Sequence, residues 1–380
     1  MKSFKLILSV VISLLLIQCS NIDRTENFQL LRTNVNELSV RVSNKLITTN
    51  WHVNLKLKPD VFKCGDIGKT VTFYSDVDSI SCILSEDTEF NFGVLIGKDT
   101  AFTQVKYKPS YLDVLRKANK FNEKDTTEIP KFVYQDSSNE HLVALRNKFN
   151  LDSIAGKGNE VSKIIHLMHW MHDIVPHDGN HMNPDDMNAM DMIRVCKRDN
   201  RGLNCRGLAI ALNECYLAMG FKSRYVTCMP KDSVFNDCHV INMVYSNDLQ
   251  KWVWMDPTQD AYVMDEKGEL LGLKEVRERL ISGKPLILNP DANWNKRVSA
   301  TREYYLCKYM AKNLYRMQSP LRSEYNYETG SYNSSEIFVE LLPLDGLCQL
   351  PKYNKRNWEG GEGSTVIYKT NDPSDFWARP

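Results

Sequence analysis

Hydrophobic and polar positions divide the chain into a strand-rich first part, a helical middle and a mixed final part. Between Trp51 and Tyr107, short runs rich in β-branched and aromatic residues alternate with turn residues, a pattern typical of strands. The runs are Val71–Tyr74, Ile80–Leu84 and Phe90–Ile96. They predict a β-rich N-terminal domain over residues 46–110.

Apolar positions spaced three and four residues apart predict helices in the middle of the chain. One helix follows Asn159, a good capping residue, and runs to Val175. A loop rich in Gly, Asn, Pro and Asp (178–191) separates it from a second helix, which begins near Cys205 and stops at Gly220.

Strands and one more helix are expected in the rest of the chain. Two strands are predicted at His239–Tyr245 and Lys251–Met255, a helix at Glu303–Met317, and tail strands at Ile337–Leu342 and Val366–Tyr368. The order of elements predicts an α+β protein. Its expected parts after the N-terminal domain are a core over residues 140–290 and a helix plus β-rich C-terminal region over 291–380.

The N-terminal segment has the pattern of an export signal. Two lysines precede an apolar run from Leu6 to Ile17, the length of a secretory signal. Because a membrane-spanning helix needs about 20 apolar residues, this run is too short to span a bilayer. We therefore expect residues 1–18 to be a signal peptide and residues 19–45 to be a polar tether.

The end of this run resembles a bacterial lipoprotein signal. Leu16 stands three positions before Cys19, although Gln18 replaces the small residue usual before that cysteine. The resemblance implies that Cys19 is acylated and holds the protein on a membrane. The expected location is the cell envelope of a Gram-negative-type bacterium, periplasmic or surface-exposed. Simple secretion or an uncleaved anchor are the alternatives.

Charge and cysteine content narrow the class of partner and the compartment. With 48 Lys and Arg against 47 Asp and Glu, the charge balance argues against nucleic acid as a partner, because nucleic acid requires a concentrated basic surface. An exported protein with 10 cysteines is permitted disulfides, and Cys64 with Cys82 is one candidate pair.

Cys205 begins a helix, and that position has chemical consequences. The unsatisfied N–H groups and the dipole at a helix N-terminus favour a thiolate, and the same N–H groups stabilise an oxyanion. Position alone also fits an inert cysteine buried in a helix.

His239 and Asp256 are predicted to meet on neighbouring strands. If Asn247-Asp248 forms a two-residue hairpin loop, Ser246 pairs with Leu249 and, along the same ladder, His239 pairs with Asp256. Directly opposed side chains lie about 4.5–5.5 Å apart at Cβ. A carboxylate there orients an imidazole, as in a nucleophile–base–acid triad. A longer loop would shift this register, and a histidine on a strand can also be purely structural.

Four segments together resemble the transglutaminase-like family of papain-related cysteine enzymes. They are Asn204–Ala209, Gly220–Val226, His239-Val240 and Trp254–Thr258. The resemblance covers about residues 155–260, under a third of the chain. It implies a papain-like, transglutaminase-type core, in which a helix bearing the cysteine packs on an antiparallel sheet bearing the histidine and the aspartate.

Carried over residue by residue, the resemblance implies that Cys205 is the nucleophile, His239 the general base and acid, and Asp256 the orienting residue. Members usually have an acidic residue soon after the cysteine, where this chain has Arg206-Gly207, and this difference bears on substrate preference.

The resemblance also implies the reaction class and the partners. Family members cross-link glutamine to amines, or cleave or deamidate amide bonds, through a thioester. Because many bacterial members are hydrolytic, we expect hydrolysis of a protein or peptide substrate, with no cofactor. The alternative is a catalytically inactive member of the fold that binds peptide or glycan at the cell envelope.

Two other sets of residues compete with this assignment. Five histidines lie within residues 166–181, and histidine clusters can bind zinc. No thiolate or carboxylate falls at a recognisable ligand spacing, so the pattern favours a polar helix face that is either solvated or lines a cleft, and no metal. Cys228 and Cys238 lie on strands without the helix-start environment, which makes them weaker nucleophile candidates. The five histidines are His166, His169, His172, His177 and His181.

Overall fold

The structure is a computed structural model that describes residues 29–55, 58–118, 120–124, 128–232, 237–330, 335–345, 353–358 and 363–380. The expected signal peptide and Cys19 lie outside these residues. The chain divides into two compact units, one ending at Pro109 and the other beginning at Ser110.

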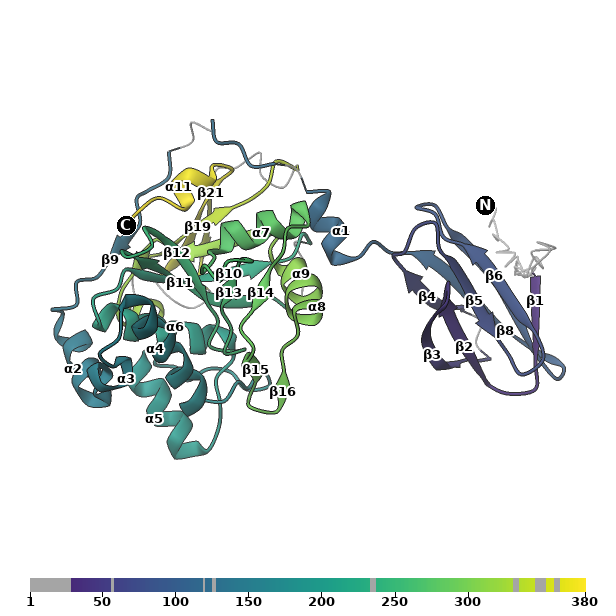
Figure 1. Ribbon diagram of the computed structural model, residues 1–380, viewed down its shortest axis with the longest axis horizontal. Helices are drawn as coiled ribbons and strands as arrows, with labels where there is room; N and C mark the ends of the chain where they lie inside the picture. The colour runs from purple at the N-terminus through teal and green to yellow at the C-terminus, as the bar shows by residue number, and fades with distance from the viewer. Residues whose placement is uncertain are drawn as a thin grey trace, which may run out of the picture. The chain divides into compact units, whose positions relative to one another are not determined.

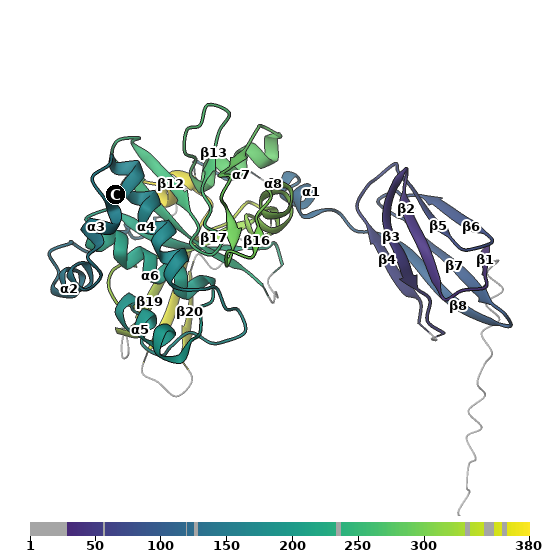
Figure 2. The ribbon, with the colours of Figure 1, turned by 60° about the horizontal axis from the view of Figure 1, so that its bottom comes forward.

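The first unit consists of two four-stranded sheets whose apolar faces form one core (Figures 1 and 2). The strand orders are β1-β7-β8-β4 and β3-β2-β5-β6. Phe62, Phe73 and Phe92 stack edge to face between them, with ring centroids 5.4 and 5.1 Å apart. The strands are β1 (Gln29–Thr33), β2 (Glu37–Val42), β3 (Lys45–His52), β4 (Asp60–Cys64), β5 (Thr70–Tyr74), β6 (Ser79–Ile83), β7 (Glu89–Ile96) and β8 (Asp99–Tyr107).

Residues 29–45 belong to this unit, in contrast to the expected tether over residues 19–45. Within β2, Leu38, Val40 and Val42 are buried while the residues between them are less buried, and Leu31 of β1 is fully buried. The alternation of buried and exposed residues in these strands was not recognised in the sequence, because this stretch is polar on average.

The candidate disulfide between Cys64 and Cys82 is absent from the structure, where both thiols are free. Cys64 ends β4 in one sheet and Cys82 lies on β6 in the other. The Cys64 thiol instead donates a hydrogen bond to the carboxylate of Asp66.

The second unit is built around a seven-stranded sheet of the described residues, in the order β12-β11-β10-β17-β19-β21-β20. Alternate residues of β11 face opposite sides. Val240 and Val244 share a core with buried residues of α2, α4, α5 and α6, while Ile241 and Met243 share a core with buried residues of α7, η1 and α9. The two sets of helices lie on opposite sides of the sheet (Figure 1). The sheet strands are β10 (Ser223–Met229), β11 (His239–Ser246), β12 (Lys251–Met255), β17 (Arg316–Pro320), β19 (Ser335–Leu341), β20 (Tyr353–Asn357) and β21 (Ser364–Thr370).

The helices of this unit include the two expected in the middle of the chain. Asn159 caps α4 as predicted, accepting a hydrogen bond from the N–H of Ser162. Across the described residues, no helix combines the length and apolar character needed to cross a bilayer. The helices are α1 (Tyr111–Arg116), α2 (Glu140–Phe149), α3 (Leu151–Ala155), α4 (Glu160–Ile174), α5 (Ala189–Asp199), α6 (Cys205–Ala218), α7 (Leu273–Ser282), α8 (Arg302–Tyr304), the π-helix η1 (Tyr305–Met310), α9 (Ala311–Asn313), α10 (Tyr327–Gly330) and α11 (Pro373–Phe376).

The region 291–380 is continuous with the core and does not form a separate part. β17 pairs with β10, and β19, β21 and β20 extend the same sheet. The helix expected over Glu303–Met317 is shorter, because Arg316 and Met317 begin β17. This unit also contains short two-stranded sheets. They are formed by β9 (Val133–Tyr134) with β18 (Arg322–Ser323), β13 (Val263–Met264) with β14 (Ile287–Leu288), and β15 (Asn293–Trp294) with β16 (Val298–Ser299).

The hairpin between β11 and β12 has a longer loop than expected. Ser246 pairs with Lys251 and not with Leu249, and Gln250 has a left-handed φ of 54° that closes a four-residue turn. The predicted register, which placed His239 opposite Asp256, is therefore wrong by two residues. Because side chains alternate with a period of two, an even shift leaves both residues on the same sheet face.

The C-terminal end packs back on the sheet. The Arg224 guanidinium, fully buried on β10, lies over the rings of Phe132 and Phe376 at 3.9 and 4.8 Å, and donates a hydrogen bond to the carbonyl of Phe376. This contact fixes α11 beside β10 and β12.

Candidate active site

The start of α6 is fixed by a pair of asparagines. Asn204 is the N-cap, and its side-chain oxygen accepts hydrogen bonds from the N–H groups of Arg206 and Gly207 at 3.0 and 3.1 Å. Asn183 donates to that same oxygen at 2.8 Å and accepts from the N–H of Asn204 at 3.1 Å. Gly207 makes room for this arrangement, since a Cβ there would lie 2.6 Å from the Asn183 side chain. Cys205 is thereby held at the first position of the helix.

His239 and Asp256 form a buried pair despite the altered register. The imidazole Nε2 lies 2.7 Å from Asp256 Oδ2, and the two residues are 1% and 0% exposed. Asp256 also accepts hydrogen bonds from the Tyr305 hydroxyl at 2.5 Å and from the N–H of Thr258 at 2.9 Å. These three donors orient the carboxylate and keep it ionised: burial alone would raise the pKa of Asp256, but the charge and hydrogen bond of His239 lower it.

The thiol of Cys205 is coupled to this imidazole. The rings of His177 and His239 and the backbone N–H of Val240 are the groups that favour its anion. Burial would raise the pKa of the thiol, but these groups lower it instead, to about 6. The structure thus brings together all three site residues indicated by the sequence.

The electrostatics favour a thiolate–imidazolium pair near neutral pH. Burial would lower the pKa of His239, but the charge and hydrogen bond of Asp256, followed by those of Cys205, raise it to about 10. Between these two pKa values the sulfur is negative and the imidazole positive, the reactive state of a cysteine nucleophile.

Two residues from η1 pack against the histidine–aspartate pair. Besides the Tyr305 hydrogen bond, the ring of Tyr309 meets His239 edge to face at 5.2 Å, and its hydroxyl lies 3.4 Å from Nδ1. The sequence analysis did not identify either tyrosine, because both come from a segment about 50 residues beyond Asp256 whose helical pattern carried no chemical signal. π-helical turns are frequent at functional sites.

His177 was not identified as a contact of Cys205 either. The sequence placed it among five histidines as a metal candidate, with nothing to separate it from the others. The other four have unrelated partners: His166 bonds to the carbonyl of Ala155, His172 to the carbonyl of Pro257, His181 to Asp178, and His169 to Asp260. The five rings therefore do not converge on one point.

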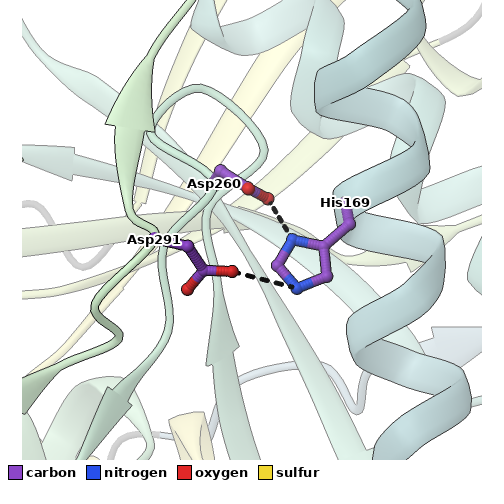
Figure 3. A group of neighbouring side chains, drawn as sticks. All are labelled: His169, Asp260 and Asp291. Atoms are coloured by element: carbon purple, nitrogen blue, oxygen red, sulfur yellow. Dashed lines mark hydrogen bonds and ion pairs between the residues drawn. The ribbon is translucent and has the colours of Figure 1, made fainter. Parts of the chain in front are cut away.

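His169 belongs to a separate group with two aspartates (Figure 3). Its Nδ1 lies 2.6 Å from Asp260 Oδ1, and its Nε2 lies 3.9 Å from Asp291 Oδ2. The carboxylates lie against different ring nitrogens, whose lone pairs diverge, so the geometry fits a protonated ring between two anions better than a shared metal ion. The hydrogen bond of Asp260 is the main reason that the pKa of His169 is raised.

The competing cysteines lack these features. Burial is the first cause that raises the pKa of Cys228 and that of Cys238. Cys228 pairs with His239 across β10 and β11 but is fully buried within the sheet core. Both thiols are thus disfavoured as anions.

Arg206, which follows the cysteine, has its charge paired. Its Nε lies 2.9 Å from both carboxylate oxygens of Glu328 on α10, and the Tyr225 hydroxyl also donates to Glu328. The residue that departs from the usual family pattern therefore joins the start of α6 to the C-terminal part of the chain.

The fold and this geometry define a class: an α+β core in which a helix begins with a cysteine and packs on the antiparallel strands β10–β12 of a mixed sheet. The histidine begins β11 and the aspartate directly follows β12. Residues 147–257 match the model of the transglutaminase-like superfamily, so the chain carries a transglutaminase-like domain. The resemblance and the fold class indicated by the sequence are confirmed.

Two solved structures are similar to the chain at low identity. A proposed cysteine protease from Cytophaga hutchinsonii is 12% identical, with a TM-score of 0.25, and the match covers 62% of this chain and 76% of that one. Red sea bream transglutaminase is 11% identical, with a TM-score of 0.23, and the match covers 61% of this chain and 49%, about half, of the bream enzyme. At such TM-scores neither likeness supports a statement about this chain's activity. Among curated proteins, none matches the chain at a significant level.

Proposed function

We propose that this protein is a cysteine-dependent enzyme that hydrolyses amide or peptide bonds, or transfers their acyl group, through a thioester on Cys205. The observation that carries the proposal is the shared imidazole: the Nε2 of His239 lies 2.7 Å from a buried carboxylate oxygen of Asp256, and the same ring lowers the pKa of the Cys205 thiol. A structural cysteine needs neither partner. The superfamily match over residues 147–257 supports a cysteine-enzyme class.

The chemistry follows from the protonation states of the pair. The Cys205 thiolate attacks the carbonyl carbon, a C–S bond forms, and the carbonyl π electrons move to oxygen. When this intermediate collapses, the C–N bond breaks and His239 gives its proton to the departing amine, which leaves a thioester. Asp256 holds the imidazole in orientation throughout and stays ionised.

The second half-reaction sets the product. If water enters, His239 takes a proton from it, the new C–O bond displaces the sulfur, and an acid is released. If an amine enters instead, the same steps give a cross-linked amide. We favour water and a protein or peptide substrate. Because the site residues lie at the start of α6 and at neighbouring strand ends, the whole reaction uses side chains of the second unit.

Acyl-enzyme trapping tests the proposal. The purified protein is incubated with a mixed peptide digest and, in parallel, with digest plus a fluorescent primary amine, then quenched in acid. Mass spectrometry should find peptide acyl groups on Cys205 in the wild type and none in Cys205→Ala. New peptide acids indicate hydrolysis and labelled peptides indicate transfer. If neither an acyl adduct nor a product forms with any digest, a binding protein that uses an inactive fold becomes the better description.

We propose that the protein is exported and is held at the cell envelope by acyl chains on Cys19, which would place the enzyme where peptides and proteins of the envelope are its substrates.

A further inference from the structure

The helix start offers fewer free hydrogen-bond donors than its position implies. An oxyanion formed on Cys205 would normally be stabilised by backbone N–H groups at the first turn. In this chain the Asn204 side chain already accepts from the N–H groups of Arg206 and Gly207. The N–H of Cys205 lies outside this cap, so a second donor has to come from elsewhere.

His177 is in place to supply that donor. Its ring is one of the groups that lower the pKa of the Cys205 thiol, and its backbone bridges to Leu203 beside that cysteine. Its Nδ1 accepts a hydrogen bond from the indole Nε1–H of Trp294 at 3.0 Å. A ring that accepts at Nδ1 carries its proton on Nε2, and Nε2 is then the nitrogen left to face the sulfur as a donor.

The backbone of His177 is held as firmly as its ring. The Asn295 side chain accepts from the N–H of His177 at 2.6 Å and donates to its carbonyl at 2.8 Å. On the other side, His177 forms a parallel bridge with Leu203, two residues before the nucleophile. Gly202 permits this close approach, since a Cβ there would lie 2.1 Å from the carbonyl oxygen of Pro176.

Both residues that hold His177 come from one small hairpin. Trp294 ends β15, and Asn295 with Lys296 forms the turn to β16, with left-handed φ angles of 51° and 56°. This hairpin lies outside the residues that match the superfamily, 147–257. Through the hydrogen bonds of Trp294 and Asn295, this hairpin fixes the position of His177 next to the active site.

We propose that His177 is the side-chain donor of the oxyanion site, oriented by Trp294 and Asn295. In the resting enzyme Nε2–H stabilises the Cys205 thiolate. When sulfur adds to the carbonyl carbon and negative charge passes to oxygen, the same N–H and the N–H of Cys205 donate to that oxygen. His177 transfers no proton, and its tautomer is unchanged through both half-reactions. The inference rests on the proposed function and adds a donor to it.

The test compares His177→Leu, His177→Gln and Trp294→Phe in the full chain, with His166→Gln as the matched control. Alkylation of Cys205 by iodoacetamide is followed from pH 4.5 to 9.5 by mass spectrometry, and acyl-enzyme formation with a digest is timed. Loss of the donor in His177→Leu should reduce alkylation at pH 5 about tenfold, because the thiolate fraction falls tenfold per pKa unit. Acyl-enzyme formation should fall about 10²–10³-fold, as for other oxyanion donors.

His177→Gln keeps an N–H donor and should restore acyl-enzyme formation to within about tenfold of the wild type. Trp294→Phe frees the His177 ring to take either tautomer, so its rate of acyl-enzyme formation should lie between those of the wild type and His177→Leu. The rate of the His166→Gln control should equal that of the wild type. Equal rates and profiles for His177→Leu and wild type would overturn the inference, as would a His177→Gln variant that folds normally but is as slow as His177→Leu.

A separate variant distinguishes this failure from failure of the proposed function. If His239→Ala raises the pH at which Cys205 reacts while His177→Leu does not, the enzyme function is supported and the donor role of His177 is contradicted. If His239→Ala leaves that pH unchanged, both the enzyme function and the donor role are contradicted.

Discussion

The thiol of Cys205 is nearly enclosed by groups that favour its anion, whereas other thiols in the same unit are surrounded by groups that do not. Two imidazoles and the N–H of Val240 lower the pKa of Cys205 to about 6. Ten residues further along the same helix, burial raises the pKa of Cys215 far above its usual range. The contrast shows that polar contacts at the helix start, and not helix membership, determine the chemistry of the thiol.

The hydrogen bond of the Tyr305 hydroxyl to Asp256 is predicted to stabilise the folded protein. Replacing Tyr305 by Phe removes the hydroxyl that donates to the buried Asp256 carboxylate at 2.5 Å. The carboxylate then loses a charge-assisted hydrogen bond, so the free energy of unfolding should fall by about 1–3 kcal/mol in urea denaturation. Tyr304→Phe is the control, because Tyr304 is 64% exposed. Equal losses for the two variants would count against the role given to Tyr305.

The sequence could identify some residues of the site and not others, for a physical reason. Cys205, His239 and Asp256 are marked by local position: a helix start, a strand start and a strand end. His177 and Tyr305 reach the same site from segments with no local feature of that kind. Only the packing of distant segments brings them there, His177 from the loop after α4 and Tyr305 from η1, and such packing has no period that can be read along the chain.

At the level of secondary structure, the β11–β12 hairpin shows that an error in the predicted loop length need not place a side chain on the wrong face of the sheet. The expected two-residue loop was wrong, and the observed turn is two residues longer. His239 and Asp256 still share a face, since only an odd shift would have separated them. Strand bounds, fixed by the apolar runs, were more predictable than the turn, which depends on Gln250 adopting a left-handed conformation.

The cap of α6 leads to a second prediction. In Gly207→Ala, the new Cβ would displace the Asn183 side chain and weaken its hydrogen bonds to Asn204. The free energy of unfolding should fall by about 1–3 kcal/mol. In an Asn183→Ala background the same substitution should cost much less, because the displaced side chain is already gone. A double-mutant cycle by urea denaturation measures this coupling, and additive losses would contradict the account.

The ion pair between His169 of α4 and Asp260, in the loop after Asp256, predicts how the stability of the fold depends on pH. The hydrogen bond of Asp260 raises the pKa of His169 above its unfolded value of about 6.5. A raised histidine pKa stabilises the fold fully below about pH 6.5, and this contribution is lost as the pH rises through the folded value. The stability difference between wild type and His169→Asn should therefore be largest near pH 6 and shrink towards pH 9.

Urea denaturation across that range measures this difference. His166→Asn is the control, because its ring bonds to the backbone carbonyl of Ala155. A difference for His169→Asn that stays constant, or grows with pH, would contradict the ion-pair interpretation.

At the scale of the whole molecule, one sheet collects segments from most of the second unit. β10, β11 and β12 come from the middle of the chain, and β17, β19, β20 and β21 come from its C-terminal part. The sequence predicted strands at the positions of β11, β12, β19 and β21, but it placed the start of β17 in a helix and did not predict β20. It also separated the two groups into different regions, because composition does not reveal that β17 adds to the free edge of β10. The first unit was predicted as β-rich, and its polar first strands were not recognised.

The proposed lipid anchor is tested on the whole protein in its native host. If Cys19 is acylated, the wild type should be recovered with membranes, and mass spectrometry should find an acylated cysteine at the mature N-terminus. Cys19→Ala should move the protein to the soluble or unprocessed fraction. Recovery of both forms in the soluble fraction would exclude the anchor.

The most direct test of the central proposal is the pH dependence of Cys205 alkylation, followed by mass spectrometry of the Cys205 peptide in the folded protein. The rate should reach half its maximum near pH 6, the pKa produced by the imidazole contacts. In His239→Ala the midpoint should move up towards the ordinary thiol value of about 8.5. A wild-type midpoint at that ordinary value, unchanged in His239→Ala, would contradict a thiolate–imidazolium pair in this protein.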